Sequence, residues 1–306
     1  MTAWLVLPLA LSALFGVLAP RLARRLPPAV ATWVLSGGAV LAAAASSVSL
    51  GLLAFIFVAP MPVLVAEGHW SDHVLRMRAG QGPVVGALAA TAVVVFAFRF
   101  LRVALRRASA VRDAFRLASA LADTDQELVV LESAGRHGLA VPGRPGRIVV
   151  TTALLRTLDA AERRALLAHE RAHLAHRHYL HQTAAVLAVA VNPFLGGLPR
   201  ALELSCERWA DEDAAHVCRR STVAHALTRA ATGTRPATSA VVLAAAGADI
   251  SARLGALRAP APRLGFWRVS VLAGLLTATT VAVAIAMHDT ERLFELAQSA
   301  YHRTSR

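Results

Sequence analysis

Lysine is absent from this 306-residue chain, and cysteine, tyrosine and acidic residues are scarce. Charged residues make up only 17% of the sequence, whereas soluble globular domains average about 25%. Two cysteines, Cys206 and Cys218, are too few for a disulfide-stapled secreted scaffold and lack metal-site spacing, so we expect small buried side chains. With 56% hydrophobic residues and a mean hydropathy of +0.52, the chain has too little polar surface for two soluble domains. We therefore expect lipid to cover part of it.

Four apolar segments are candidates for membrane spans, each of which takes about 20 residues with a range near 17–25. They are residues 3–19, 32–58, 84–98 and 270–287. The first differs from a signal peptide because no basic segment precedes it and its arginines follow the apolar run. The sequence thus predicts three transmembrane helices in residues 1–98, and a fourth with a short outer tail in residues 268–306.

Arginine supplies all of the positive charge, and the formal net charge is +13. Arginine clusters follow the first and third spans and precede the fourth, so the positive-inside rule places residues 20–28 and 99–268 in the cytoplasm. The loop at residues 61–82 has mixed charge, which suits the outer side. We expect a multi-pass protein of the cell membrane, and we assign the basic charge to the flanks of its spans. Direct binding of nucleic acid is not expected.

Residues 99–267 are expected to form one cytoplasmic domain of the α+β type. A polar helix around residues 108–121 precedes three strand-like runs, and glycine and proline mark the turns between them. The runs are residues 127–131, 139–141 and 147–152. Asp159 followed by Glu162 then predicts the capped start of a long helix. The fold class is therefore a mainly α membrane protein with about four transmembrane helices and a cytoplasmic α+β domain.

A further apolar stretch, Thr183–Leu198, is interrupted by Asn192-Pro193 and by Gly196-Gly197. Proline and paired glycine in the middle of an apolar run argue against a simple span. We expect a helix that lies on the membrane or dips into it.

The capped helix carries His169-Glu170-Arg171-Ala172-His173. Residues four apart share one face of a helix, so both imidazoles can bind one ion, while Glu170 can reach a water on that ion. This is the HExxH zinc signature, which chance would produce about 0.015 times in a chain of this composition. Three more histidines follow on the same helix as we expect it, so a histidine-rich helix without metal is the alternative. They are His176, His178 and His181.

A catalytic zinc site needs a third protein ligand and one open position. On a straight helix His176 lies about 10.5 Å from His169 along the axis, whereas two ligand atoms on one zinc lie within about 4 Å. Glu207 follows thirty-four residues after His173 on a second expected helix, with Asp211 one turn later. We predict that Glu207 is the third ligand, and that Asp211 holds the outer nitrogen of a ligand histidine.

Three segments resemble the membrane-embedded gluzincin metallopeptidases, which include the HtpX-like heat-shock proteases and the BlaR/MecR-type antirepressor peptidases. They are Ala140–Thr151, His169–His173 and Glu207–Asp211. The "HERAHL" wording and the layout of the spans look closest to the short actinobacterial BlaR-like group. Because the chain stops 19 residues after Met287, we do not expect the penicillin-binding sensor of BlaR.

The resemblance implies an integral membrane Zn²⁺-dependent endopeptidase that cuts cytosolic or membrane-proximal polypeptides. Glu170 would take the proton of the attacking water. Residues 139–141 would form an edge strand that binds substrate, and the alternative is that this strand serves only as part of the sheet. The BlaR-like group implies a BlaI-type repressor as partner, and the HtpX-like group implies misfolded membrane protein. The alternative is a non-proteolytic zinc-binding membrane receptor or scaffold of the same fold. Glu170 favours the peptidase, because a scaffold needs no general base.

Overall fold

The computed structural model describes residues 2–78, 80, 82–120, 127–231, 240–260 and 263–304. Four helices in these ranges are long and apolar enough to cross a membrane, and they contain all four predicted spans. They are α1 (Thr2–Ala23), α2 (Pro28–Val58), α5 (Pro83–Ala120) and α12 (Phe266–Thr304). The mainly α membrane class predicted from the sequence is therefore confirmed. One expectation is wrong: the polar helix around residues 108–121 is not separate, because α5 runs on without a break.

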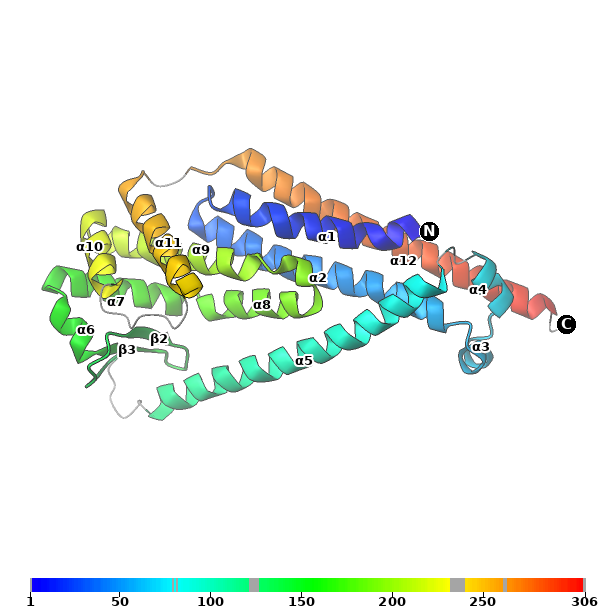
Figure 1. The fold of residues 1–306 in the computed structure, drawn as a ribbon, viewed down its shortest axis with the longest axis horizontal. Helices are drawn as coiled ribbons and strands as arrows, with labels where there is room; N and C mark the ends of the chain where they lie inside the picture. The colour runs from blue at the N-terminus through cyan, green and yellow to red at the C-terminus, as the bar shows by residue number, and fades with distance from the viewer. Residues whose placement is uncertain are drawn as a thin grey trace.

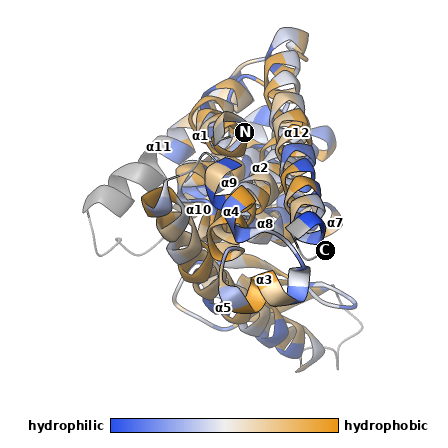
Figure 2. Ribbon diagram, turned by 90° about the vertical axis from the view of Figure 1, so that its right-hand side faces the viewer, coloured by the Kyte–Doolittle hydropathy of each residue, from blue (hydrophilic) through white to orange (hydrophobic). Residues whose placement is uncertain are grey.

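The long helices lie side by side and hold the rest of the chain at their two ends (Figure 1). α1 packs against α2 and α12, and α5 packs against α2 but slopes away from it toward the β-sheet. Two short helices, α3 (Pro62–Gly68) and α4 (Asp72–Arg78), lie at the same end as both termini. The opposite end carries the sheet and most of the remaining short helices. Figure 2 shows this arrangement along the long axis, with hydrophobic residues along the helices.

The largest hydrophobic core lies where α1 and α2 meet the helices that follow the HExxH segment. Phe15 and Leu35 are fully buried there, together with Leu198 and Leu202. Gly16 allows a close approach of two backbone segments, because a Cβ at this position would overlap the backbone carbonyl of Phe194. The membrane bundle and the second half of the chain therefore share one core.

The sheet has the order β1-β3-β2, with β1 (Leu128–Leu131) parallel and β2 (Gly138–Val141) antiparallel to β3 (Arg147–Thr151). β3 is buried along its whole length, as expected for a central strand. β2 forms an edge of this sheet, and Leu139 on it is 57% exposed. The three predicted strands are thus confirmed within one residue of their expected bounds.

Helix α6 (Thr152–Thr157) leads from the sheet to the HExxH helix, α7 (Ala160–Ala175). Asp159 accepts hydrogen bonds from the backbone of Ala161 and Glu162, and Glu162 accepts one from the backbone N–H of Asp159. This is the predicted capping box. The later helices are α8 (His178–Val191), η1 (Pro193–Leu195), α9 (Leu198–Val217), α10 (Arg220–Ala231) and α11 (Ala240–Arg258).

The HExxH helix ends earlier than expected. His176 caps α7, Arg177 adopts a left-handed conformation with φ of 50°, and α8 begins at His178. The expectation that His176, His178 and His181 extend the same helix is therefore wrong. A left-handed residue at this point redirects the chain toward the bundle, although no glycine marks the position.

α8 packs against α2 and α5 and then turns back through η1 into α9. Its 14 residues span about 21 Å, which is shorter than the roughly 30 Å of a hydrocarbon core. At the turn, Asn192 is buried and donates a hydrogen bond of 2.8 Å to Ser46 in the middle of α2. The predicted interruption at Asn192-Pro193 is confirmed, while the depth of α8 in a bilayer stays a prediction.

The close contact at Gly16 can be tested by comparing two helical glycines. Gly16→Ala should lower the thermal unfolding temperature in detergent, because the added Cβ overlaps the carbonyl of Phe194. Gly37→Ala should leave it unchanged or raise it, since nothing lies within 4 Å of a Cβ there and alanine favours helix by up to about 1 kcal/mol. Equal unfolding temperatures for the two variants would contradict this packing.

Candidate metal centre

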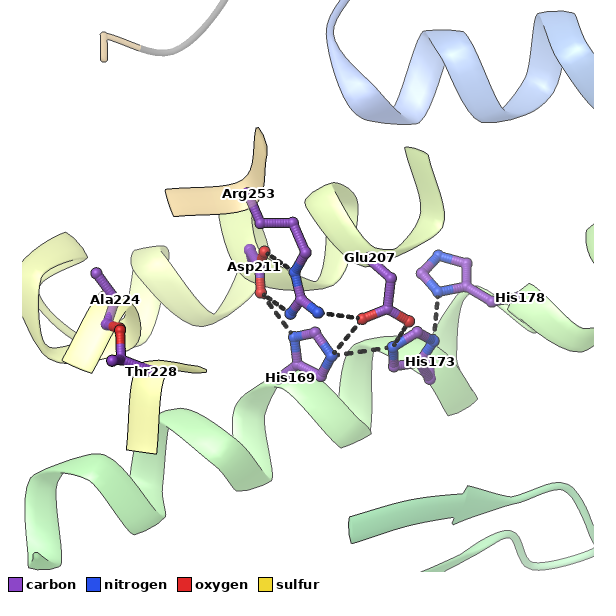
Figure 3. A network of polar contacts seen from close by, with 8 residues as sticks. All are labelled: His169, His173, His178, Glu207, Asp211, Ala224, Thr228 and Arg253. Atoms are coloured by element: carbon purple, nitrogen blue, oxygen red, sulfur yellow. Dashed lines mark hydrogen bonds and ion pairs between the residues drawn. The ribbon is translucent and has the colours of Figure 1, made fainter. Parts of the chain in front are cut away.

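Both histidines of the HExxH segment face a carboxylate on the neighbouring helix α9 (Figure 3). His169 Nε2 and His173 Nε2 lie 3.1 Å apart. Glu207 places one oxygen 3.4 Å from His169 Nε2 and the other 3.4 Å from His173 Nε2. The structure therefore brings together the three residues that the sequence predicts as metal ligands.

The three groups fit a zinc ion in both geometry and chemistry. Two atoms bound tetrahedrally to zinc, each about 2.0–2.1 Å away, lie about 3.3 Å from each other. The separations of 3.1 and 3.4 Å are close to this value. Two imidazoles and one carboxylate are a donor set of catalytic zinc sites, which leave one position open. His169, His173 and Glu207 could hold Zn²⁺ with little rearrangement.

Asp211 lies behind His169, where the sequence analysis places it. Its carboxylate is 3.0 Å from His169 Nδ1, so Nδ1–H donates to Asp211 while Nε2 faces Glu207. Burial alone would lower the pKa of His169, but the hydrogen bonds and charges of Asp211 and Glu207 outweigh it and raise the pKa to about 9. Without a metal His169 is therefore a cation at neutral pH, and a metal ion at Nε2 would replace that proton.

Arg253 on α11 completes this side of the site and was missed by the sequence analysis. Its guanidinium lies 2.7 and 2.8 Å from the two oxygens of Asp211 and 2.8 Å from Glu207. Burial would raise the pKa of both carboxyls, but His169 and Arg253 hold each pKa below its ordinary value. Arg253 follows Asp211 by 42 residues and belongs to no recognisable motif, so no local signal marks it.

His178 was also not predicted to contact the site. It is 1% exposed, and its Nδ1 lies 2.9 Å from His173 Nδ1. Burial, the largest cause, lowers the pKa of His173 to about 4 and that of His178 to about 3, so both rings are neutral. With a metal ion on His173 Nε2, the ring proton of His173 would sit on Nδ1 and be donated to His178. The helix break at Arg177 makes this contact possible.

His176 takes no part in the donor cluster. Its Nε2 lies 2.7 Å from Asp213, and its ring stacks on Trp209 with 4.0 Å between centroids. The chain does bend after His176, contrary to the straight helix of the sequence argument. The bend nevertheless places the His176 imidazole against Asp213 and not against Glu207.

Glu170 lies between the donor cluster and the edge strand. It is 8% exposed, and burial raises its pKa above the ordinary value, although the charge of His169 and a backbone hydrogen bond from Ala140 oppose the shift. A Cβ at Gly138 would lie 3.3 Å from Glu170 Oε1. A cavity of about 320 Å³ joins these groups, and Glu170, His169, Glu207, Arg253 and Gly138 line it.

Comparison with known proteins gives one result. Residues 106–234 match the profile of Peptidase family M48, a span that includes the sheet, α7 and α9 and ends before Arg253. No curated protein and no solved structure matches the chain significantly. M48 peptidases are zinc-dependent in general. The match and the four apolar helices together support a membrane-type gluzincin metallopeptidase.

The ligand assignment predicts a clear order among three variants. Glu207→Ala should lose most bound zinc, whereas His176→Ala should keep it near the wild-type level because His176 contacts Asp213 instead. Asp211→Ala should weaken zinc binding about 10–100-fold, as is usual for groups that orient a ligand histidine. Metal analysis of the purified variants measures this order. Zinc retained in Glu207→Ala but lost in His176→Ala would refute the assignment.

The His173–His178 contact predicts a second effect on the metal. His178→Ala should weaken zinc about 10–100-fold, because His173 loses the acceptor that fixes its Nδ1–H. His178→Gln keeps an acceptor and should recover part of the loss. His181→Ala is the matched control, since His181 contacts Ser36 in α2. Titration against a chelator of known affinity gives the values, and unchanged affinity in His178→Ala would contradict the role.

Proposed function

We propose that this protein is an integral membrane zinc-dependent metalloendopeptidase that hydrolyses peptide bonds in cytosolic or membrane-proximal proteins. The observation that carries the proposal is Glu170, a buried carboxyl that lines the same cavity as His169 and Glu207 of the donor cluster. The match of residues 106–234 to Peptidase family M48 supports the same reaction. A receptor or scaffold would use the donor cluster but not the carboxyl.

In this mechanism the residues of the chain bind the ion, orient the substrate and move one proton. Bound Zn²⁺ supplies Lewis acidity, which makes water a nucleophile near neutral pH and polarises the scissile carbonyl. Glu170 takes the proton of the attacking water and passes it to the leaving amine. Its raised pKa suits both steps, because the carboxyl must first accept a proton and then release it.

The edge strand β2 supplies a place for the substrate backbone. Its outer edge lies beside Glu170, since the backbone of Ala140 hydrogen-bonds to that carboxyl. An extended peptide can add to such an edge through main-chain hydrogen bonds. Pairing with β2 would therefore hold a peptide bond beside Glu170 and the donor cluster, with little demand on its side chains.

The domain is proposed to face the cytoplasm. Arginines gather where α5 leaves its apolar part, and they are exposed. They are Arg99, Arg102, Arg106 and Arg107. Positive charge at this end of a span favours the cytoplasmic side. The resemblance to BlaR-type peptidases makes a BlaI-type repressor the first protein substrate to test, and the HtpX-like resemblance makes misfolded membrane protein the second.

Replacing the proposed base separates a peptidase from a zinc-binding scaffold. Glu170→Gln should keep its zinc and lose about 10²–10⁴-fold in cleavage of a casein-type substrate. Glu132→Gln is the matched control, because Glu132 is exposed and lies outside the cavity. The measurement uses purified, zinc-loaded protein in detergent. If wild type and Glu170→Gln cleave equally, the peptidase proposal fails.

A further inference from the structure

A long groove follows one face of α2, away from the metal centre. Two adjoining cavities of about 610 and 920 Å³ form it, and both are lined by Val40 and Ala184. From Trp33 to Leu50 the lining residues of α2 recur every three or four positions, so they share one face. Seventeen steps along a helix correspond to about 25 Å. The groove is therefore long and narrow, and it runs parallel to the membrane-spanning helices.

Small side chains on α2 leave this space open. Nothing lies within 4 Å of the position that a Cβ on Gly37 would occupy, and Ala43 and Ala44 continue the same face. Phe96 and Phe100 of α5 close the opposite side. The hydroxyl of Ser47, also in the wall, is satisfied by the carbonyl of Ala43. The wall of the 610 Å³ cavity is therefore apolar, because its one serine already donates its hydroxyl proton within α2.

The other cavity ends in cationic and aromatic groups. Arg177 is exposed there, and no ion pair or side-chain hydrogen bond of its guanidinium occurs within the described residues. Trp33 stands edge-on to His181, whose Nδ1 contacts the hydroxyl of Ser36. No acidic residue lines this cavity. Its charge therefore complements an anion.

We propose that the groove binds one anionic phospholipid, with the phosphate at Arg177 and an acyl chain along α2. The order of chemistry along the groove is that of a lipid in a bilayer: tryptophan and arginine occupy the interface, and apolar residues lie deeper.

The proposed headgroup site adjoins the metal centre. His176 and Trp209 line the cationic cavity, and the Trp209 ring lies 5.3 Å from that of His178, which contacts His173. The lipid site nevertheless contains none of the metal donors, so it can be tested on zinc-free protein and does not depend on peptidase activity.

Lipid preference tests the cationic end. Full-length protein is delipidated, exposed to equal amounts of phosphatidylglycerol and phosphatidylcholine with identical chains, and examined by native mass spectrometry. Wild type should retain phosphatidylglycerol about fivefold over phosphatidylcholine, and Arg177→Gln should reduce this ratio to about one. Arg102→Gln is the control, because Arg102 is an exposed arginine of α5 outside the groove lining. An unchanged ratio in Arg177→Gln overturns the proposal.

Filling the groove tests the lipid itself. Gly37→Leu should reduce retained phosphatidylglycerol at least about threefold by occupying the space of the lipid. Gly51→Leu is the matched control, since it is equally free of contacts on α2 but lines neither cavity. Equal retention in both variants overturns the proposal. So does loss of the preference when inorganic phosphate is added, because the site would then bind a free anion rather than a lipid.

Discussion

Glu207 and Asp211 lie one helical turn apart on α9, largely shielded from water, and the groups around them compensate their charge. With Glu170 the site contains three carboxyls, and Arg253 is the cation that contacts two of them. The formal charges of the three ionised carboxyls and Arg253 sum to −2, and a divalent ion would bring this sum to zero. Without an ion, His169 takes up a proton instead, as its raised pKa shows. Burying unpaired charge is costly. The carboxylates on α9 are therefore paired with His169 on α7 and with Arg253 on α11.

The membrane bundle sets the spacing of the donor cluster. Between His173 and Glu207 the chain runs through α8, η1 and the first half of α9, and this hairpin packs on α1, α2 and α5. Asn192 fixes its turn to Ser46, and Gly16 lets η1 approach α1 closely. The two sides of the metal cluster are thus the two ends of a hairpin inserted beside the spans. A change in bundle packing would move Glu207 relative to His173.

Local patterns in the sequence predict the spans, the strands and the capped HExxH helix, because each depends on residues near one another in the chain. The capping box at Asp159 needs only two side chains three residues apart. Glu207 can be proposed from sequence because the two histidines of the HExxH motif need a third protein ligand to complete a zinc site. Arg253 has no such context, since its role depends on the packing of α11 against α9. Contacts of this kind arise from tertiary structure and leave no periodic signal.

The helix break after His176 shows a second limit of predicting structure from local sequence patterns. Sequence reasoning ends a helix at glycine or proline, but here Arg177 adopts the left-handed conformation, which costs a residue other than glycine roughly 1–2 kcal/mol. The burial of His178 against His173 and Trp209, and the packing of α8 on α2, offset that cost. Only the folded arrangement therefore shows why the helix ends there.

The same break places the proposed reaction close to the bilayer. α8 enters the bundle five residues after His173, so the donor cluster lies within about one and a half helical turns of the membrane-spanning helices. A peptide paired with β2 would be held at this level, beside the end of the bundle. Under the proposed peptidase function, we therefore expect membrane-proximal polypeptides to reach β2 more readily than proteins far from the bilayer.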